Sequence, residues 1–181
     1  MGMLKLYGLH ASNYYNMTKL ALLEKGFEFD EIQTSPSQES QDLTMSPMGK
    51  IPCLEAREGF LSETIEIMEF LDEVNPEIPL FPDAPFERAK VRESMRACEL
   101  YIERSVSRLK ATVNTAGGNH DQIIDEIKPQ IAKGLKALTR LAKFQPLLSG
   151  EVVRLCGYCC LPYLWFCRKK YEVPLWLGSD G

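Results

Sequence analysis

The sequence predicts an α/β domain followed by an all-helical domain. Short apolar segments that suit strands alternate with helical patterns over residues 1–75, whereas only helical spacing follows a proline-rich stretch. A length of 181 residues accommodates one large or two small domains. We therefore assign residues 1–75 to an α/β domain, 76–86 to a linker, 87–150 to a helical domain and 151–181 to an atypical tail.

The first domain is expected to run β-α-β and then ββα. Its first helix should begin at Ser12-Asn13, a typical cap, and end at Gly26, where a left-handed residue is favoured. The expected elements are, in order, a strand at 3–8, that helix, a strand at 27–32, a loop with a short helix at 33–49, a hairpin at 52–55 and 59–61, and a helix that ends near 74.

The second domain shows two apolar stripes with helical spacing, separated by Gly117-Gly118-Asn119. The four prolines before it are Pro76, Pro79, Pro82 and Pro85. The stripes are Val91, Met95, Cys98, Ile102, Val106, Leu109 and Val113, and then Ile124, Ile127, Ile131, Leu135, Leu138 and Ala142. We expect both stripes to form the core of a helical bundle.

The composition argues against several classes of partner. A net charge of −4 without a Lys/Arg cluster argues against a nucleic-acid-binding protein. The longest apolar stretch, residues 155–167, is too short to span a bilayer and contains Pro162, so we expect no membrane partner. The first residues show no apolar leader segment, which favours a cytoplasmic location.

A cysteine cluster near the C-terminus has the spacing of a redox pair or of half a zinc site. It comprises Cys156, Cys159 and Cys160. A structural zinc site needs four ligands, yet the chain has no second Cys-x-x-Cys, and His10 and His120 lie far away in sequence. We therefore expect no metal.

The most informative motif is the turn Ser46-Pro-Met-Gly-Lys-Ile-Pro-Cys-Leu54, which Glu63-Thr64 follows. We expect a cis bond before Pro52, which would turn the backbone N–H and C=O of Ile51 outward to pair with an extended peptide. Glu63-Thr64 stands where a helix begins, so free N–H groups would face an anion and the Glu63 carboxylate an ammonium group. One end of a small zwitterionic peptide would fit there. The alternative is a proline-rich turn and a helix cap without a ligand.

These motifs resemble the glutathione-binding half of the cytosolic glutathione transferases. That family carries a Gly-Lys-Val/Ile-Pro turn and then Glu-Ser at a helix start, and here Thr64 keeps the hydroxyl of the usual serine. Residues 3 to about 80 match the pattern, with Leu4-Lys5-Leu6-Tyr7 as the first strand. The resemblance implies a thioredoxin-like N-terminal domain and an all-α C-terminal domain. It also implies glutathione as co-substrate without a further cofactor, a small electrophile as second substrate, and a homodimer.

The resemblance also implies residue roles. Ser12 lies five residues after Tyr7, like the catalytic serine of the serine-type enzymes, and its hydroxyl would stabilise the glutathione thiolate. Asn13 and Tyr14 are the next candidates, and Tyr7 is a weaker one. The binding residues would be Ile51 with Pro52 for the cysteinyl part, Glu63 and Thr64 for the γ-glutamyl end, Lys50 for the glycyl carboxylate, and Gln38.

The expected reaction is conjugation of the glutathione thiolate to an electrophilic small molecule, with a role in detoxification. A glutathione-dependent peroxidase or disulfide reductase is an open alternative, because a Ser or Asn donor suits either chemistry. A non-catalytic transferase-like binding protein is the third alternative. A shared fold does not by itself establish activity.

The tail departs from the family pattern. The family places an aromatic residue and Ala-Asp after Leu148-Ser149-Gly150, whereas this chain reads Glu151-Val-Val-Arg-Leu-Cys-Gly-Tyr-Cys-Cys-Leu-Pro. Reading from the second base of the Glu151 codon permits Lys/Arg, Ser/Leu, Phe, Gly, Phe/Tyr, Ala, Asp, Ile, Ala, Ala, Phe, which contains both features. We therefore hypothesise a frame-shifted tail from about residue 151, which the coding DNA would test.

Overall fold

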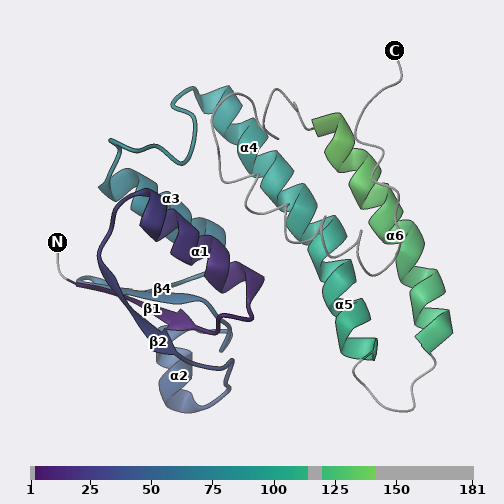
Figure 1. Ribbon diagram of the computed structural model, residues 1–181, viewed down its shortest axis with the longest axis horizontal. Helices are drawn as coiled ribbons and strands as arrows, with labels where there is room; N and C mark the ends of the chain where they lie inside the picture. The colour runs from purple at the N-terminus through teal and green to yellow at the C-terminus, as the bar shows by residue number, and fades with distance from the viewer. Residues whose placement is uncertain (1–2, 114–119, 142–181) are drawn as a thin grey trace. The chain divides into compact units, whose positions relative to one another are not determined.

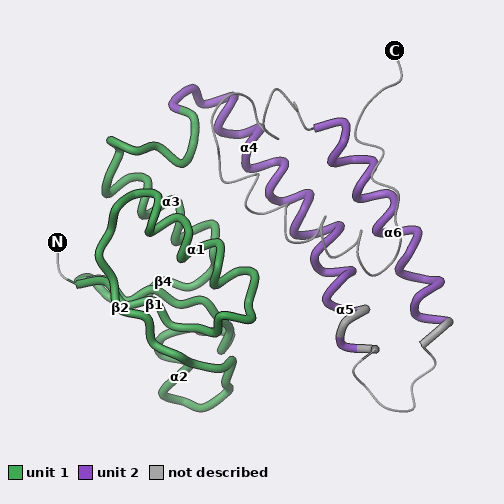
Figure 2. The backbone as a smooth tube through the Cα atoms, in the orientation of Figure 1, with its two compact units in different colours: residues 1–82 green, residues 83–181 purple. Residues whose placement is uncertain are grey.

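The computed structural model describes residues 3–113 and 120–141. The chain divides into two compact units, residues 1–82 and 83–181 (Figure 2). The division falls inside the segment 76–86 that the proline pattern marks as a linker. The tail at 151–181, its cysteine cluster and the Gly117-Gly118-Asn119 break lie outside the described residues, so the frame-shift hypothesis stays a prediction.

Unit 1 is built on a four-stranded mixed sheet with the order β2-β1-β3-β4. The strands are β1 (Leu4–Gly8), β2 (Phe29–Gln33), β3 (Cys53–Ala56) and β4 (Gly59–Ser62). β1 pairs in parallel with β2 and antiparallel with β3, and β3 pairs antiparallel with β4. The helices α1 (Asn13–Glu24) and α3 (Thr64–Val74) cover one face, and the short α2 (Ser40–Met45) lies on the other (Figure 1). The predicted α/β class and element order are confirmed.

The core of unit 1 lies between the sheet and the helices α1 and α3. Alternation along β1 buries Leu4, Leu6 and Gly8 on this face and leaves Lys5 and Tyr7 half-exposed on the other. The helices contribute the buried residues Tyr15, Ala21, Leu22, Ile67, Met68 and Leu71. Each fully buried large apolar side chain contributes about 1.5–3 kcal/mol, so this layer supplies most of the unit's hydrophobic stabilisation.

A buried ion pair joins the ends of α1 and α3. Lys25 caps α1, and its Nζ lies 3.0 Å from Asp72 Oδ1. The same ammonium donates to the carbonyl oxygens of Asn75 and Ile78 at 2.7 and 2.6 Å. Asp72 Oδ1 also accepts the Leu80 N–H at 2.6 Å. This pair therefore fixes the chain that leaves α3 against the end of α1.

Unit 2 is helical in its described part, as predicted. Its elements are α4 (Pro85–Ala97), the π-helical segment η1 (Cys98–Glu103), α5 (Arg104–Val113) and α6 (His120–Leu141). Of the first stripe Val91, Met95, Cys98, Ile102 and Val106 are buried, and of the second Ile127, Ile131, Leu135 and Leu138. Ala142 and the side chains of Leu109 and Val113 lie outside the described part.

Several element boundaries differ from the expectations. α4 begins at Pro85 rather than 87, because proline suits the first turn of a helix. β2 begins at Phe29 rather than Phe27, since the Phe27 N–H bonds to the Leu22 carbonyl after the end of α1. The π-helical turn between α4 and α5 was not expected. Within the described residues, no helix has the length and apolar character to cross a membrane.

Candidate functional site

The strand register brings the candidate segments to one end of the sheet. Tyr7, Cys53 and Ser62 form one row across β1, β3 and β4, and Gly8 at the end of β1 lies opposite Gln33 of β2. The segments 9–12, 51–52 and 63–64 therefore all leave the sheet at this end. The helices α1 and α3 also begin here, and helix N-termini favour anions.

The turn before β3 has the predicted cis bond between Ile51 and Pro52. Among the described residues, the backbone N–H and C=O of Ile51 have no hydrogen-bond partner. Lys50 is held by its backbone N–H, which donates to Ser46 Oγ at 3.1 Å, while its side chain is exposed. The Ile51 N–H can therefore donate a hydrogen bond to an extended peptide added beside this turn, and the Ile51 C=O can accept one from it.

Gly49 is the residue that lets this turn close. Its φ is 59°, and a Cβ atom there would lie 1.7 Å from the Ser37 carbonyl oxygen. The Gly49 carbonyl in turn accepts the Ser37 N–H at 3.0 Å. Gln38, a predicted binding residue, is exposed and donates its side-chain amide to the Met48 carbonyl at 3.0 Å. The segment 37–38 thus packs directly on the turn that carries Lys50 and Ile51.

Glu63 and Thr64 stand at the start of α3, as expected. Thr64 is buried, whereas Glu63 is exposed and makes no side-chain capping bond. Glu63 also has a φ of 71° and a ψ of 122°, in a region that non-glycine residues rarely occupy. Such backbone conformations cluster at ligand-binding sites. No sequence signal indicated this geometry, because glutamate has no preference for positive φ.

Ser12 caps α1 through its side chain. Its Oγ accepts the Tyr15 N–H at 3.3 Å, and its own N–H donates to the Leu9 carbonyl at 2.9 Å. Accepting a bond uses a lone pair of the hydroxyl and leaves its proton available to an incoming anion. The capping role and a thiolate-donor role are therefore compatible. Asn13 and Tyr14 follow in the first helical turn, both half-exposed.

Tyr7, the weaker candidate, is already engaged on the opposite face of the sheet. Its hydroxyl donates to Glu55 Oε2 at 2.5 Å. This bond, with burial and the Glu55 charge, raises the pKa of Tyr7 to about 12. The Tyr7 hydroxyl already donates its proton to a carboxylate, and its raised pKa disfavours ionisation. Tyr7 is therefore a poor hydrogen-bond donor to a thiolate.

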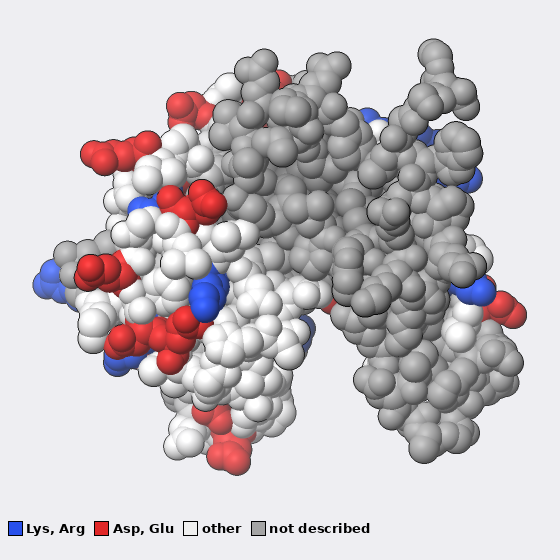
Figure 3. Space-filling model, in the orientation of Figure 1, with Lys and Arg blue, Asp and Glu red and all other residues white. Residues whose placement is uncertain are grey.

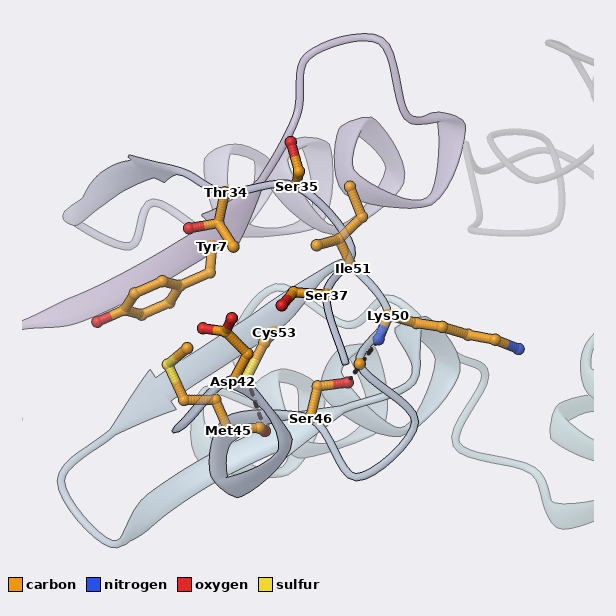
Figure 4. Close-up of a pocket in the computed structure, with 11 residues that line it drawn as sticks. Tyr7, Thr34, Ser35, Ser37, Asp42, Met45, Ser46, Lys50, Ile51 and Cys53 are labelled. Atoms are coloured by element: carbon orange, nitrogen blue, oxygen red, sulfur yellow. Dashed lines mark hydrogen bonds between the residues drawn. The ribbon is translucent and has the colours of Figure 1, made fainter. Parts of the chain in front are cut away.

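A separate pocket lies on the α2 side of the sheet (Figure 4). Tyr7, Asp42, Met45, Ile51 and Cys53 line it, together with Thr34, Ser35, Ser37, Ser46, Gly49 and Lys50. Of the predicted site it includes only Lys50 and Ile51, and the Lys50 side chain points away from it (Figure 4). Ser12, Glu63 and Thr64 do not line this pocket, although it shares Lys50 and Ile51 with the proposed peptide-binding segments.

Cys53 does not offer a reactive thiol. Its Sγ donates to the Met45 carbonyl at 3.1 Å, and its side chain is buried. Burial raises the pKa of Cys53 to about 11, so the thiol stays neutral near pH 7. No group of three or more metal-ligating side chains occurs in the described ranges 3–113 and 120–141. On the face of unit 1 in Figure 3, acidic side chains lie among basic ones and no extended basic patch is seen.

Comparisons with known proteins converge on one family. Residues 6–79 match the family model for the glutathione S-transferase N-terminal domain. A glutathione S-transferase of Pseudomonas putida is 41% identical over 153 residues, which cover 84% of this chain and 70% of that protein. A glutathione S-transferase structure from Rhodospirillum rubrum aligns with a TM-score of 0.77 at 22% identity, covering 95% of this chain and 81% of the other. A glutathione transferase homologue from Drosophila mojavensis, solved with bound glutathione, gives 0.79 at 17% identity with 96% and 81% coverage.

Proposed function

Because this chain belongs to the glutathione S-transferase family, we propose that it binds glutathione at the end of the sheet where α1 and α3 begin. There it conjugates the glutathione thiolate to an electrophilic small molecule. The observation that carries this proposal is the strand register, which gathers three segments at one end of the sheet. Those segments supply a hydroxyl donor, a backbone edge and a helix start with a carboxylate.

The binding part of the proposal assigns each segment to one portion of the peptide. The free backbone groups of Ile51, beside cis Pro52, pair with the cysteinyl residue. The Glu63 carboxylate binds the α-ammonium of the γ-glutamyl end, and Thr64 with the first N–H groups of α3 binds its carboxylate. Lys50 is exposed and reaches the glycyl carboxylate, and Gln38 assists from the adjoining loop.

The catalytic part rests on the hydroxyl of Ser12. A free thiol has a pKa of about 8.5, so a donor and a helix N-terminus are needed to keep it ionised at neutral pH. Ser12 lies at the start of α1, and in the described structure its hydroxyl accepts a hydrogen bond but donates none. Asn13 and Tyr14 follow it in the first turn of the helix. The thiolate then attacks the electrophilic carbon, a C–S bond forms, and the leaving group departs or the acceptor is protonated.

The decisive experiment is calorimetric titration with glutathione. We expect the unaltered chain to bind with a Kd between about 1 μM and 1 mM, and Glu63→Ala to lose most of that affinity. Glu58→Ala is the matched control, because Glu58 is also an exposed glutamate but lies in the hairpin turn at the far end of the sheet. No binding by the folded chain would reject the proposal in favour of a non-catalytic role.

Turnover is tested with Ser12→Ala in the same background. Loss of one donor to a developing anion costs roughly 10²-fold or more in kcat, with glutathione affinity largely kept. Assays with an aryl halide and with a hydroperoxide, run in parallel, separate conjugation from the peroxidase alternative. Equal activity of Ser12→Ala and the parent chain would reject Ser12 as the thiolate donor and leave Asn13 and Tyr14 as the candidates.

We further propose a cytoplasmic homodimer, which is typical of the family. Phe86 at the start of α4 is 73% exposed and is available to a partner copy, whereas Phe81 is buried and is not. Light scattering after size-exclusion chromatography tests the dimer, and Phe86→Glu should favour the monomer. A monomeric parent chain at micromolar concentration would reject this part of the proposal.

A further inference from the structure

Three groups near the start of α1 converge on one carboxylate. Glu31, on the edge strand β2, accepts the Tyr15 hydroxyl at 2.5 Å and the Lys19 ammonium at 2.7 and 2.9 Å. His10 Nδ1 lies 3.7 Å from the same carboxylate. The hydrogen bonds from Lys19 and Tyr15 lower the pKa of Glu31, so it stays charged near neutral pH.

Tyr15 connects this carboxylate to Ser12. Its ring is fully buried, and a Cβ added to Gly8 would lie 2.5 Å from the ring, so the ring is closely confined. Its backbone N–H makes the capping bond to Ser12 Oγ. One residue therefore contacts the candidate thiolate donor through its backbone and Glu31 through its hydroxyl.

His10 ties the loop before Ser12 to the same cluster. Its ring lies edge-on to Tyr15 at 5.5 Å, and its Nε2 lies 2.9 Å from the side-chain amide of Gln33. Asn16 in the first turn of α1 donates to the His10 carbonyl at 2.8 Å. The loop is thus bound on one side to β2 and on the other to α1.

We infer that Glu31 and Tyr15 are positioning residues that set the place of the Ser12 hydroxyl for the thiolate. This inference rests on the proposed function of Ser12. A misplacement of about 1 Å in a reacting group can cost 10²-fold in rate, so losing the Tyr15–Glu31 bond should lower kcat about tenfold. The KM for glutathione should change less than twofold, because neither side chain belongs to the proposed peptide-binding segments.

The test uses Tyr15→Phe, which removes the hydroxyl and keeps the buried ring. Besides the lower kcat, we expect the pKa of bound glutathione, followed by thiolate absorbance, to rise. Glu31→Ala should behave alike, and Glu31→Gln should recover part of the loss because its amide oxygen still accepts the hydroxyl. Tyr7→Phe is the matched control: it also removes a tyrosine–glutamate bond of 2.5 Å, but on the other face of the sheet.

Hydrogen exchange separates this inference from the proposed function. Tyr15→Phe should speed exchange of the residue-15 amide that donates to Ser12 Oγ, with or without glutathione, and Tyr7→Phe should not. Unchanged exchange together with an unchanged thiol pKa in a folded Tyr15→Phe variant would overturn the inference. A parent chain that binds no glutathione overturns the proposed function instead, and the exchange rates still decide whether the pair holds the Ser12 segment.

Discussion

The two faces of the sheet in unit 1 carry the same chemical pair in different surroundings. On the helix-covered face, Tyr15 is fully buried and donates to Glu31. On the α2 face, Tyr7 is half-exposed and donates to Glu55 at the same 2.5 Å. Only Tyr15 also bonds to the Ser12 side chain. Because the two bonds have the same length, the role inferred for Tyr15 rests on its contact with Ser12 and not on the length of its bond to Glu31.

The two faces also differ in their lysines. Lys25, at the ends of α1 and α3 on the helix-covered side, has a side chain with 0% exposure and is paired with Asp72. Lys5, on the α2 face, pairs with Glu55 at 3.1 Å with side chains 36% and 29% exposed. Burial magnifies both the attraction and the cost of losing one partner, so these lysines should respond differently to the same substitution.

The largest expected effect is on Lys25. Lys25→Met removes the ammonium group that pairs with the buried Asp72 carboxylate and donates to two carbonyl oxygens, so it should lower the free energy of unfolding by about 3–5 kcal/mol. Lys5→Met should lower it by less than about 1 kcal/mol. Urea unfolding followed by circular dichroism measures both. Similar losses for the two variants would mean that the faces do not differ in this respect.

A smaller effect is expected at alkaline pH. Burial, with the Glu31 bond, raises the pKa of Tyr15, and the Glu55 bond raises that of Tyr7. A raised folded-state pKa favours the folded state below the ordinary value of 10.0, and that contribution is lost as pH rises through the folded pKa. Tyr7→Phe and Tyr15→Phe should each flatten the fall in stability above pH 10.

The contributions of the two tyrosines to stability at alkaline pH should also differ in their dependence on salt. The raised pKa of Tyr7 depends first on its hydrogen bond to the half-buried Glu55 carboxylate, so 1 M salt should reduce that contribution, whereas the raised pKa of Tyr15 depends first on burial, which is insensitive to salt. Thermal melts between pH 9 and pH 12 at low and high salt provide the measurement. Equal salt sensitivity of the two contributions would contradict the assignment of causes.

The smallest effect is expected in acid. Lys19 is the first cause that lowers the pKa of Glu31, whereas Tyr7, ahead of Lys5, lowers that of Glu55. A lowered folded-state pKa gives stability above the ordinary value of 4.5, which is lost as pH falls through the folded pKa. Lys19→Met should therefore reduce the acid-dependent loss of stability more than Lys5→Met. The reverse order in melts between pH 3 and pH 6 would refute this.

Local patterns in the sequence predict the scaffold of the site well. The apolar-rich segment 3–8 forms β1, Ser12 caps α1 and Pro52 is cis, all as expected. Each depends on residues close in sequence, so propensity and turn chemistry suffice. The candidate roles of Ser12, Glu63 and Lys50 stay predictions, because they require a bound peptide to test.

The contacts that the sequence does not reveal are long-range or depend on the backbone. Lys25 and Asp72 are 47 residues apart, and a lysine at a helix end is ordinarily solvated. The bond between Tyr15 and Glu31 spans a helix and a neighbouring strand, and charge patterning does not single out that pair. The positive φ of Glu63 and the π-helical turn at Cys98–Glu103 have no signal in residue type.

The register of the hairpin has a practical consequence for anyone handling this protein. Ala56 pairs with Gly59, so the tight turn Arg57-Glu58 projects at the opposite end of the sheet from the segments that gather near Ser12, and both residues are exposed. Exposed turns of this kind tolerate insertions. A fluorophore, an affinity tag or a surface linker attached there would immobilise or report on the protein while leaving the proposed peptide-binding end open.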